Sequence, residues 1–370
     1  MGTKVLRIAI PMLMVLIDGC IEPLEIAAVS NLNKLVVDGM VTNEPGPYTV
    51  KISHTVSTDA LSSDAVPVTD AKVSIVEDGT IVRDLYQAGG GVYQTYNNWQ
   101  AQVGKTYAVR IITSTQKEYR SEPQVLTDAG SIDNIYTEFE DDAIVYQSDG
   151  SEKQDAINVS VDAKAATTST GHLRWRFKGT FHARTYPELR YYETLNDERI
   201  PDPLPCSGHI NYFDELLKIG DCTCCECWPT EYNNSILLSN TQFTQHAEYK
   251  NVLLHKIPVT SVRMINLYHV EIEQLSLSTE VYNFWKLVKT LQESSGSIFQ
   301  PSAVKVRGNI VTADGKSDEV LGIFAVCGIT RKSVFIDRAL IPYAFTPETG
   351  NVNACKAIFP NATDKPAYWP

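Results

Sequence analysis

Short runs of alternating apolar and polar residues, separated by turn signals, recur along the chain and constrain its fold more than any other feature. The run at 48–53 alternates after the proline-rich turn at 43–47, and related patterns return at 71–75 and 104–112. Such alternation places successive side chains on opposite faces of a strand. Short strands at this spacing, with turns between them, are typical of a β-sandwich. We therefore expect a mainly β protein.

The length of the chain indicates more than one domain. It has 370 residues, which exceeds the usual size of one domain. We place an immunoglobulin-like or carboxypeptidase-regulatory-like β-sandwich at residues 30–127. Strand patterns continue at 156–161 and 303–310, so residues 128–370 are expected to form a larger β-rich domain.

One segment, near 279–293, has helical rather than strand periodicity. Val281, Phe284 and Trp285 begin an apolar stripe at helical spacing, and Ser278 can cap the first turn. We expect an amphipathic helix whose Phe-Trp pair packs on a sheet, in preference to a ligand platform.

A second distinctive strand pattern alternates apolar and basic residues. Arg174, Arg176 and Lys178 fall on one face of the strand predicted at 173–178. That face either meets an anionic partner or is an ordinary solvated surface, and we favour the solvated surface.

The first twenty residues resemble a bacterial lipoprotein signal. Basic residues precede an apolar run at 8–17, and the sequence leading to Cys20 resembles a lipobox. We expect residues 1–19 to be a removed signal peptide, Cys20 to carry lipid, and 20–29 to be a tether. Acyl chains contribute about 0.8 kcal/mol per buried CH₂, which suffices for durable membrane attachment. The alternative is an ordinary signal peptide with Cys20 in a disulfide.

Cysteines supply a second chemical feature, because four of them crowd into 222–227. An exported protein favours disulfides, although interleaved C-x-x-C pairs with His209 or His246 offer an alternative zinc site. Cys327 lies in an apolar run and is expected to be a buried thiol. The remaining six allow fifteen connectivities, and we favour a bridge between Cys355 and the cysteine-rich loop at 206–228. The disulfide candidates are Cys206, Cys222, Cys224, Cys225, Cys227 and Cys355.

Other functional signals are weak. The formal net charge of −12 disfavours a nucleic-acid partner, which would require clustered Lys and Arg. Hydrolase and metalloprotease motifs are missing, so we expect no enzyme, no catalytic residues, no cofactor and no metal. The acidic run at 138–142 is interpreted as a solvated loop in preference to a calcium site. Tyr186, Tyr191 and Tyr192 offer a possible surface for a sugar or peptide, although packing in the core or at a strand edge is the favoured role.

Short motifs follow one another along the chain at Glu22-Pro23, 35–39, 45–50, Cys227-Trp228, 284–286, 295–299, 308–310, 321–324 and 366–369. Their order resembles an uncharacterised lipoprotein family of Bacteroidetes, catalogued as domain of unknown function 4249. The resemblance implies a lipid-anchored protein of the outer membrane, exposed at the cell surface, with no established catalytic activity. It also implies an accessory of a TonB-dependent receptor in ligand capture or uptake. The alternative is a structural or adhesive component of the envelope, or an assembly factor.

Overall fold

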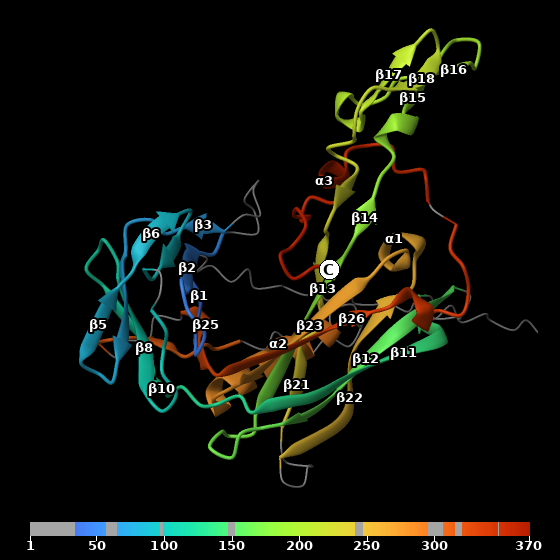
Figure 1. Cartoon of the computed structure of the whole chain (residues 1–370). Helices are drawn as coiled ribbons and strands as arrows, with labels where there is room; N and C mark the ends of the chain where they lie inside the picture. The colour runs from blue at the N-terminus through green and yellow to red at the C-terminus, as the bar shows by residue number, and fades with distance from the viewer. Residues whose placement is uncertain are drawn as a thin grey trace, which may run out of the picture. The chain divides into compact units, whose positions relative to one another are not determined.

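The computed structural model describes a mainly β chain, as the alternating patterns predict (Figure 1). All described residues belong to one compact unit. The expected signal peptide, the tether and Cys20 lie outside the described residues. The described ranges are 34–56, 65–96, 99–146, 152–240, 247–294, 306–314, 320–346 and 348–370.

Two sheets enclose the first core. One has the order β25-β1-β2-β7-β6 with β3 beside β2, and the other has the order β24-β9-β8-β4-β5 with β10 beside β8. Val37, Ile52, Ile75 and Val109 are fully buried in the core that the two sheets share. The strands are β1 (Leu35–Thr42), β2 (Thr49–His54), β3 (Val66–Pro67), β4 (Lys72–Glu77), β5 (Ile81–Asp84), β6 (Tyr86–Gly89), β7 (Val92–Gln94), β8 (Thr106–Ile112), β9 (Glu118–Ser121), β10 (Gln124–Val125), β24 (Ile310–Thr312) and β25 (Leu321–Cys327).

Two strands from late in the chain complete this first sandwich. β25 lies parallel to β1, in a register that pairs Val36 with Leu321. β24 pairs antiparallel with β9. Both strands come from the segment 128–370, which the sequence assigns to a second domain. The first sandwich therefore contains strands beyond those of residues 30–127.

The second core lies between two further sheets, of order β11-β12-β22 and β20-β13-β23-β26, with β21 beside β13. Trp175, Phe177 and Ile272 are almost completely buried in it. The strands are β11 (Ser131–Val145), β12 (Lys153–Lys164), β13 (Leu173–Phe181), β20 (Thr230–Tyr232), β21 (Leu237–Ser239), β22 (Glu248–Pro258), β23 (Tyr268–Ser276) and β26 (Ile329–Ile336).

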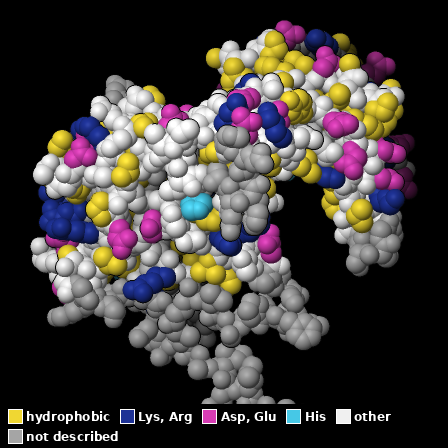
Figure 2. Space-filling model, turned by 90° about the horizontal axis from the view of Figure 1, so that it is seen from below, with side chains coloured by type: hydrophobic (Ala, Val, Ile, Leu, Met, Phe, Trp, Pro, Cys, Tyr) yellow, Lys and Arg dark blue, Asp and Glu magenta, His cyan; other side chains and the backbone are white. Residues whose placement is uncertain are grey.

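The basic face of β13 is neutralised by its neighbour in the sheet. Arg176 forms an ion pair with Glu273, and Lys178 lies 3.7 Å from Glu271. Arg174 instead stacks over the ring of Trp285 at 3.7 Å. Figure 2 shows acidic side chains interspersed with Lys and Arg over one face of the molecule. The strand's cations are thus engaged by partners within the protein.

The predicted helix is α2 (Thr279–Ser294). The hydroxyl of Ser278 accepts the backbone N–H of Val281 at 3.3 Å, which is the capping contact that the sequence predicts. Val281 is fully buried, and the partly buried Phe284 and Trp285 pack against the same apolar cluster. Two one-turn helices, α1 (Ser261–Met264) and α3 (Cys355–Ile358), complete the α-helices of the described residues, beside short 3₁₀ turns such as Arg338–Leu340. None of the described helices has the length and apolar character needed to cross a bilayer.

Candidate functional site: a disulfide-braced arm

Residues 185–226, which we call the arm, leave the second core through β14 (Ala183–Arg184) and return through β19 (Glu226–Cys227). These two strands pair with each other and form the base of the arm. Beyond them the arm contains two small hairpins, drawn next to one another in Figure 1. The hairpins are β15 (Tyr191–Glu193) with β16 (Arg199–Pro201), and β17 (His209–Tyr212) with β18 (Glu215–Lys218).

Local sequence explains why the arm turns where it does. Pro187 and Pro205 each begin a single turn of 3₁₀ helix, where a fixed φ and a missing N–H are tolerated. In the β15–β16 turn, the backbone N–H of Thr194 donates to the carbonyl of Glu198 at 2.9 Å. The β17–β18 turn instead has a two-residue loop, Phe213 and Asp214.

Phe213 occupies an unusual backbone conformation. Its φ is +50° and that of Asp214 is +62°, the combination that a tight hairpin turn requires. Glycine or asparagine normally fills such positions, and a bulky residue there costs on the order of 1 kcal/mol. The ring is nevertheless 84% exposed, with Tyr212 packed edge-on at 4.6 Å. Neither turn propensity nor core packing accounts for a phenylalanine at this tip.

Three disulfides brace the arm, and they use all six candidate cysteines. Cys206 bonds to Cys224, Cys222 to Cys225, and Cys227 to Cys355. The last bridge is the long-range one favoured from the sequence, and it ties the base of the arm to α3. Because all six sulfurs are used in S–S bonds, the alternative zinc site has no thiolate ligands here. His246 of that alternative lies outside the described residues.

Cys327 is the free cysteine of the described chain, and it is buried. Burial raises the pKa of its thiol to about 12. A thiol in this environment is expected to be unreactive.

Large apolar side chains are exposed along the arm. Hairpins of this size have too few residues to bury a core of their own, so disulfides substitute for one. A concentration of exposed apolar groups is typical of a protein-binding or membrane-binding surface. The exposed side chains are Leu189, Tyr191, Tyr192, Leu195, Ile210, Tyr212, Phe213, Leu216, Leu217 and Ile219.

The predicted tyrosine surface is divided by the structure. Tyr186 is half-buried beside Arg184, whereas Tyr191 and Tyr192 are exposed on β15. Because they are adjacent on a strand, the two exposed rings face opposite sides. Tyr191 lies under Arg199 at 4.5 Å and lines a groove of about 620 Å³. The groove is lined by Leu189, Tyr191, Glu193, Thr349, Gly350 and Val352.

The arm also carries half of the formal net charge of the chain. It contains nine acidic residues and three Lys or Arg, a balance of −6 against −12 for the whole chain. Each of the three cations already has an acidic neighbour: Arg190 is 2.7 Å from Asp202, Arg199 is 3.2 Å from Glu193, and Lys218 is 3.5 Å from Asp221. The remaining acidic residues are Glu188, Asp197, Glu198, Asp214, Glu215 and Glu226. The apolar surface of the arm is therefore interleaved with an excess of carboxylates.

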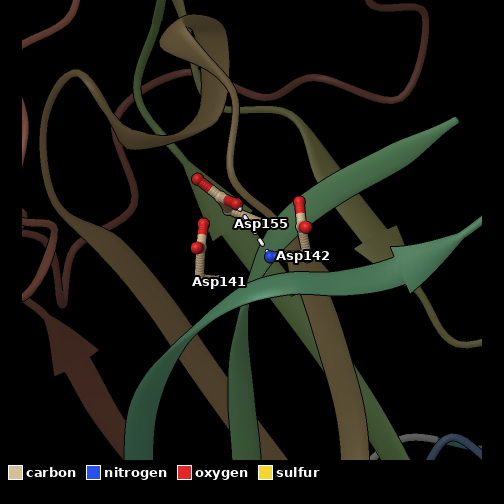
Figure 3. Close-up of side chains that lie close together, drawn as sticks. All are labelled: Asp141, Asp142 and Asp155. Atoms are coloured by element: carbon tan, nitrogen blue, oxygen red, sulfur yellow. Dashed lines mark hydrogen bonds between the residues drawn. The ribbon is translucent and has the colours of Figure 1, made fainter.

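A separate acidic cluster lies at the irregularity in β11. Asp141, Asp142 and Asp155 lie close together (Figure 3). One carboxylate oxygen from each residue lies within 4.8 Å of those of the other two. The hydrogen bond that Asp141 shares with Asp155 raises the pKa of Asp141, whereas the hydroxyl of Tyr343 lowers that of Asp155. Tyr343 donates to Asp155 at 2.6 Å, and Lys153 lies 3.0 Å from Asp142. Asp155 and Asp142 thus have partners outside the cluster, and Asp141 has Asp155. The acidic run at 138–142, which the sequence assigns to a solvated loop, lies instead within strand β11.

Sequence reasoning missed most of the arm's exposed side chains. Of these side chains, the sequence indicates only Tyr191 and Tyr192 as a possible ligand surface. It does not indicate Leu195, Phe213 or Ile219. The available signal for Phe213 and Ile219 was their position between Cys206 and Cys222, and that for Leu195 was its position between Pro187 and Pro201. Hydrophobic residues in such short, braced segments have little core to join.

Comparison with known proteins gives one result. A family model described as Domain of unknown function (DUF4249) matches residues 21–333. No curated protein matches the chain.

Proposed function

We propose that this chain, which belongs to the family described as Domain of unknown function (DUF4249), is a lipid-anchored envelope protein that binds another envelope protein through the arm. Cys20 would carry the lipid, and the protein would lie at the outer membrane, exposed at the cell surface. Its role would be non-enzymatic. The partner we favour is a TonB-dependent receptor, with this chain assisting ligand capture or uptake.

The observation that carries the proposal is the exposure of apolar side chains on a covalently braced arm. Each exposed apolar Å² costs about 25 cal/mol relative to burial, so these groups gain most when a partner covers them. Leu195 is fully exposed and Phe213 is 84% exposed, and each lies in the turn of its hairpin. Disulfides reduce the conformational freedom of the arm, which lowers the entropy lost on binding.

Charge indicates what kind of surface the arm fits. The acidic excess opposes approach to an anionic membrane, since carboxylates beside inserted apolar groups would have to be desolvated. Asp214 directly follows Phe213, and Asp197 lies two residues from Leu195. A protein surface with apolar pockets and a cationic rim satisfies both kinds of group.

Affinity purification from the native envelope tests the proposal. The full chain is tagged and recovered in mild detergent. The arm variant combines Phe213→Ser with Leu217→Ser, and the matched control is Val82→Ser. Val82 is an exposed apolar residue of β5, outside the arm. We expect an outer-membrane receptor in stoichiometric amount with the wild type and the control, and at least about tenfold less with the arm variant, which corresponds to about 1.4 kcal/mol.

Equal recovery with the arm variant would overturn the proposed role of the arm. Recovery of only further copies of this chain or of surface polymers would replace the receptor with the structural or adhesive alternative.

A further inference from the structure

The Cys222–Cys225 bridge differs from the other two disulfides in its surroundings. It borders a cleft of about 340 Å³ at the base of the arm, whose lining includes both of its cysteines. Cys222 is partly exposed there, whereas Cys225 is 5% exposed. Cys227 and Cys355 are completely buried. Cys206 and Cys224 are partly exposed, as Cys222 is, but neither of them lines this cleft. An attacking group can therefore reach one sulfur of this bridge from the cleft.

The cleft also provides charged groups suited to thiol chemistry. Two cations, Arg184 and Lys218, line it together with the bridge, and so do the carboxylates of Glu188, Asp221 and Glu226. Neighbouring cations lower the pKa of a thiol and so raise the fraction present as the reactive thiolate. The carboxylate of Glu188 lies 3.8 Å from Sγ of Cys225. Once Cys225 carries a proton, that carboxylate is in place to accept it in a hydrogen bond.

We propose that the Cys222–Cys225 bridge is a thiol-exchange site, with Cys222 as the sulfur that an external dithiol attacks. The inference goes beyond the binding role of the arm and does not depend on it. The co-reactant is a dithiol, either a small molecule or a protein.

The exchange proceeds in two displacements. A thiolate of the dithiol attacks Sγ of Cys222, the bond to Cys225 breaks, and Cys225 leaves as a thiolate that takes up a proton. The second thiolate of the dithiol then attacks the dithiol sulfur that is bonded to Cys222 in the mixed disulfide. Cys222 leaves as a thiolate and is protonated in turn. The dithiol loses two electrons and two protons and becomes a disulfide, and the bridge gains them as two thiols.

The arm keeps its attachment when this bridge is open. Cys222 and Cys225 are three residues apart, whereas Cys227 and Cys355 are 128 apart. The longer loop contributes more to the stability of the fold, because its closure removes more entropy from the unfolded chain. Opening the short bridge therefore leaves a folded protein in which the dithiol form can accumulate.

The test measures how fast each bridge opens in the full chain in detergent. Dithiothreitol is the probe, the reaction is stopped by alkylation at successive times, and each cysteine is quantified by peptide mass spectrometry. We expect Cys222 and Cys225 to be labelled with a half-time at least about tenfold shorter than the other bridged cysteines. Cys327 serves as an internal reference that stays unlabelled while the protein is folded, and circular dichroism follows the fold.

A pair of variants tests which sulfur is attacked. In Cys225→Ser the accessible Cys222 remains, and in Cys222→Ser the buried Cys225 remains. With oxidised glutathione as the probe, we expect the mixed disulfide to form at least about tenfold faster on the first variant.

Opening of all three bridges at one rate, or first opening of Cys206–Cys224, would overturn the proposal. So would equal glutathionylation of the two variants. The kinetics of the wild-type chain decide the question even if a variant does not fold, and neither measurement involves the partner of the arm.

Discussion

Cys227 at the base of the arm and Cys355 on α3 are joined by a disulfide, across 128 residues of sequence. Both residues are completely buried and belong to the second core. The backbone supports the same junction, because the N–H of Cys355 donates to the carbonyl of Cys224 at 2.8 Å. The bridge thus fixes the arm to the body of the protein, while the other two lie within the arm.

This difference in position predicts a difference in stability. The double variant Cys227→Ser with Cys355→Ser should lose about 4 to 5 kcal/mol of unfolding free energy, because its loop is long. The Cys206–Cys224 bridge closes a loop of only 18 residues, so the matched double variant Cys206→Ser with Cys224→Ser should lose about 3 kcal/mol or less. Denaturant unfolding followed by circular dichroism measures both. A larger loss in the second variant would contradict this account of the base.

The parallel pairing of β25 with β1 predicts a severe effect at Gly322. Its φ is +88°, and a Cβ there would lie 2.0 Å from the carbonyl oxygen of Val37. Gly322→Ala should therefore lower the free energy of unfolding by more than about 2 kcal/mol, since strand β25 must shift away from β1. Gly79→Ala is the control, because that glycine has a φ of +72° and no atom within 4 Å of the added Cβ. It should cost only about 1 kcal/mol of backbone strain.

An ion pair on the first sandwich predicts a pH effect. Hydrogen bonds from Arg110, aided by Arg120, lower the pKa of Glu118 to about 2. A carboxylate with a lowered folded pKa adds stability above its unfolded pKa, and this contribution is lost as pH falls toward 2. Glu118→Gln should lower the unfolding free energy by about 1 kcal/mol or less at pH 7, since the pair is partly exposed. The difference from the wild type should shrink between pH 4.5 and pH 2, and a difference independent of pH would contradict the assignment.

The backbone conformation at the tip of the arm predicts that one substitution will weaken partner binding without lowering the unfolding free energy. Phe213→Gly removes a side chain from a position with φ of +50°, where glycine carries no steric cost. Unfolding free energy should stay unchanged or rise by about 1 kcal/mol, whereas recovery of the envelope partner should fall. A destabilised variant with normal partner recovery would show that the ring has a structural role.

Lipid attachment has its own test, since Cys20 lies outside the described residues. Cys20→Ser should move the protein from the membrane fraction into the soluble fraction, because the acyl chains supply the attachment. Membrane fractionation with immunoblotting measures the distribution. Retention that still requires detergent for release would contradict the lipoprotein assignment.

Local signals predict local structure well in this chain. The cap at Ser278 and the apolar stripe beginning at Val281 define α2, because helix formation depends on residues three and four positions apart. Strand alternation likewise reveals β8, whose buried and half-buried residues alternate along its length. These features involve neighbours in sequence, so the sequence alone contains the needed information.

Non-local pairing is what the sequence does not reveal. Strand β25 pairs with β1, which begins at Leu35, almost 290 residues earlier in the chain, and nothing local identifies that pairing. The cysteine connectivity poses the same problem, because fifteen arrangements are compatible with the sequence. The exposed surface of the arm depends on both the hairpins and the bridges. The sequence alone therefore does not show which of its side chains are exposed.

Site-specific photo-crosslinking in intact cells tests the central claim most directly. A photoreactive residue is placed at Phe213 in the arm and, as the matched control, at Val82 on β5. The account predicts a crosslink from position 213 to one defined outer-membrane protein, with little or none from position 82. Equal crosslinking from the two positions, or none from position 213 in a protein that is folded and anchored, would contradict the assignment of the arm as the binding surface.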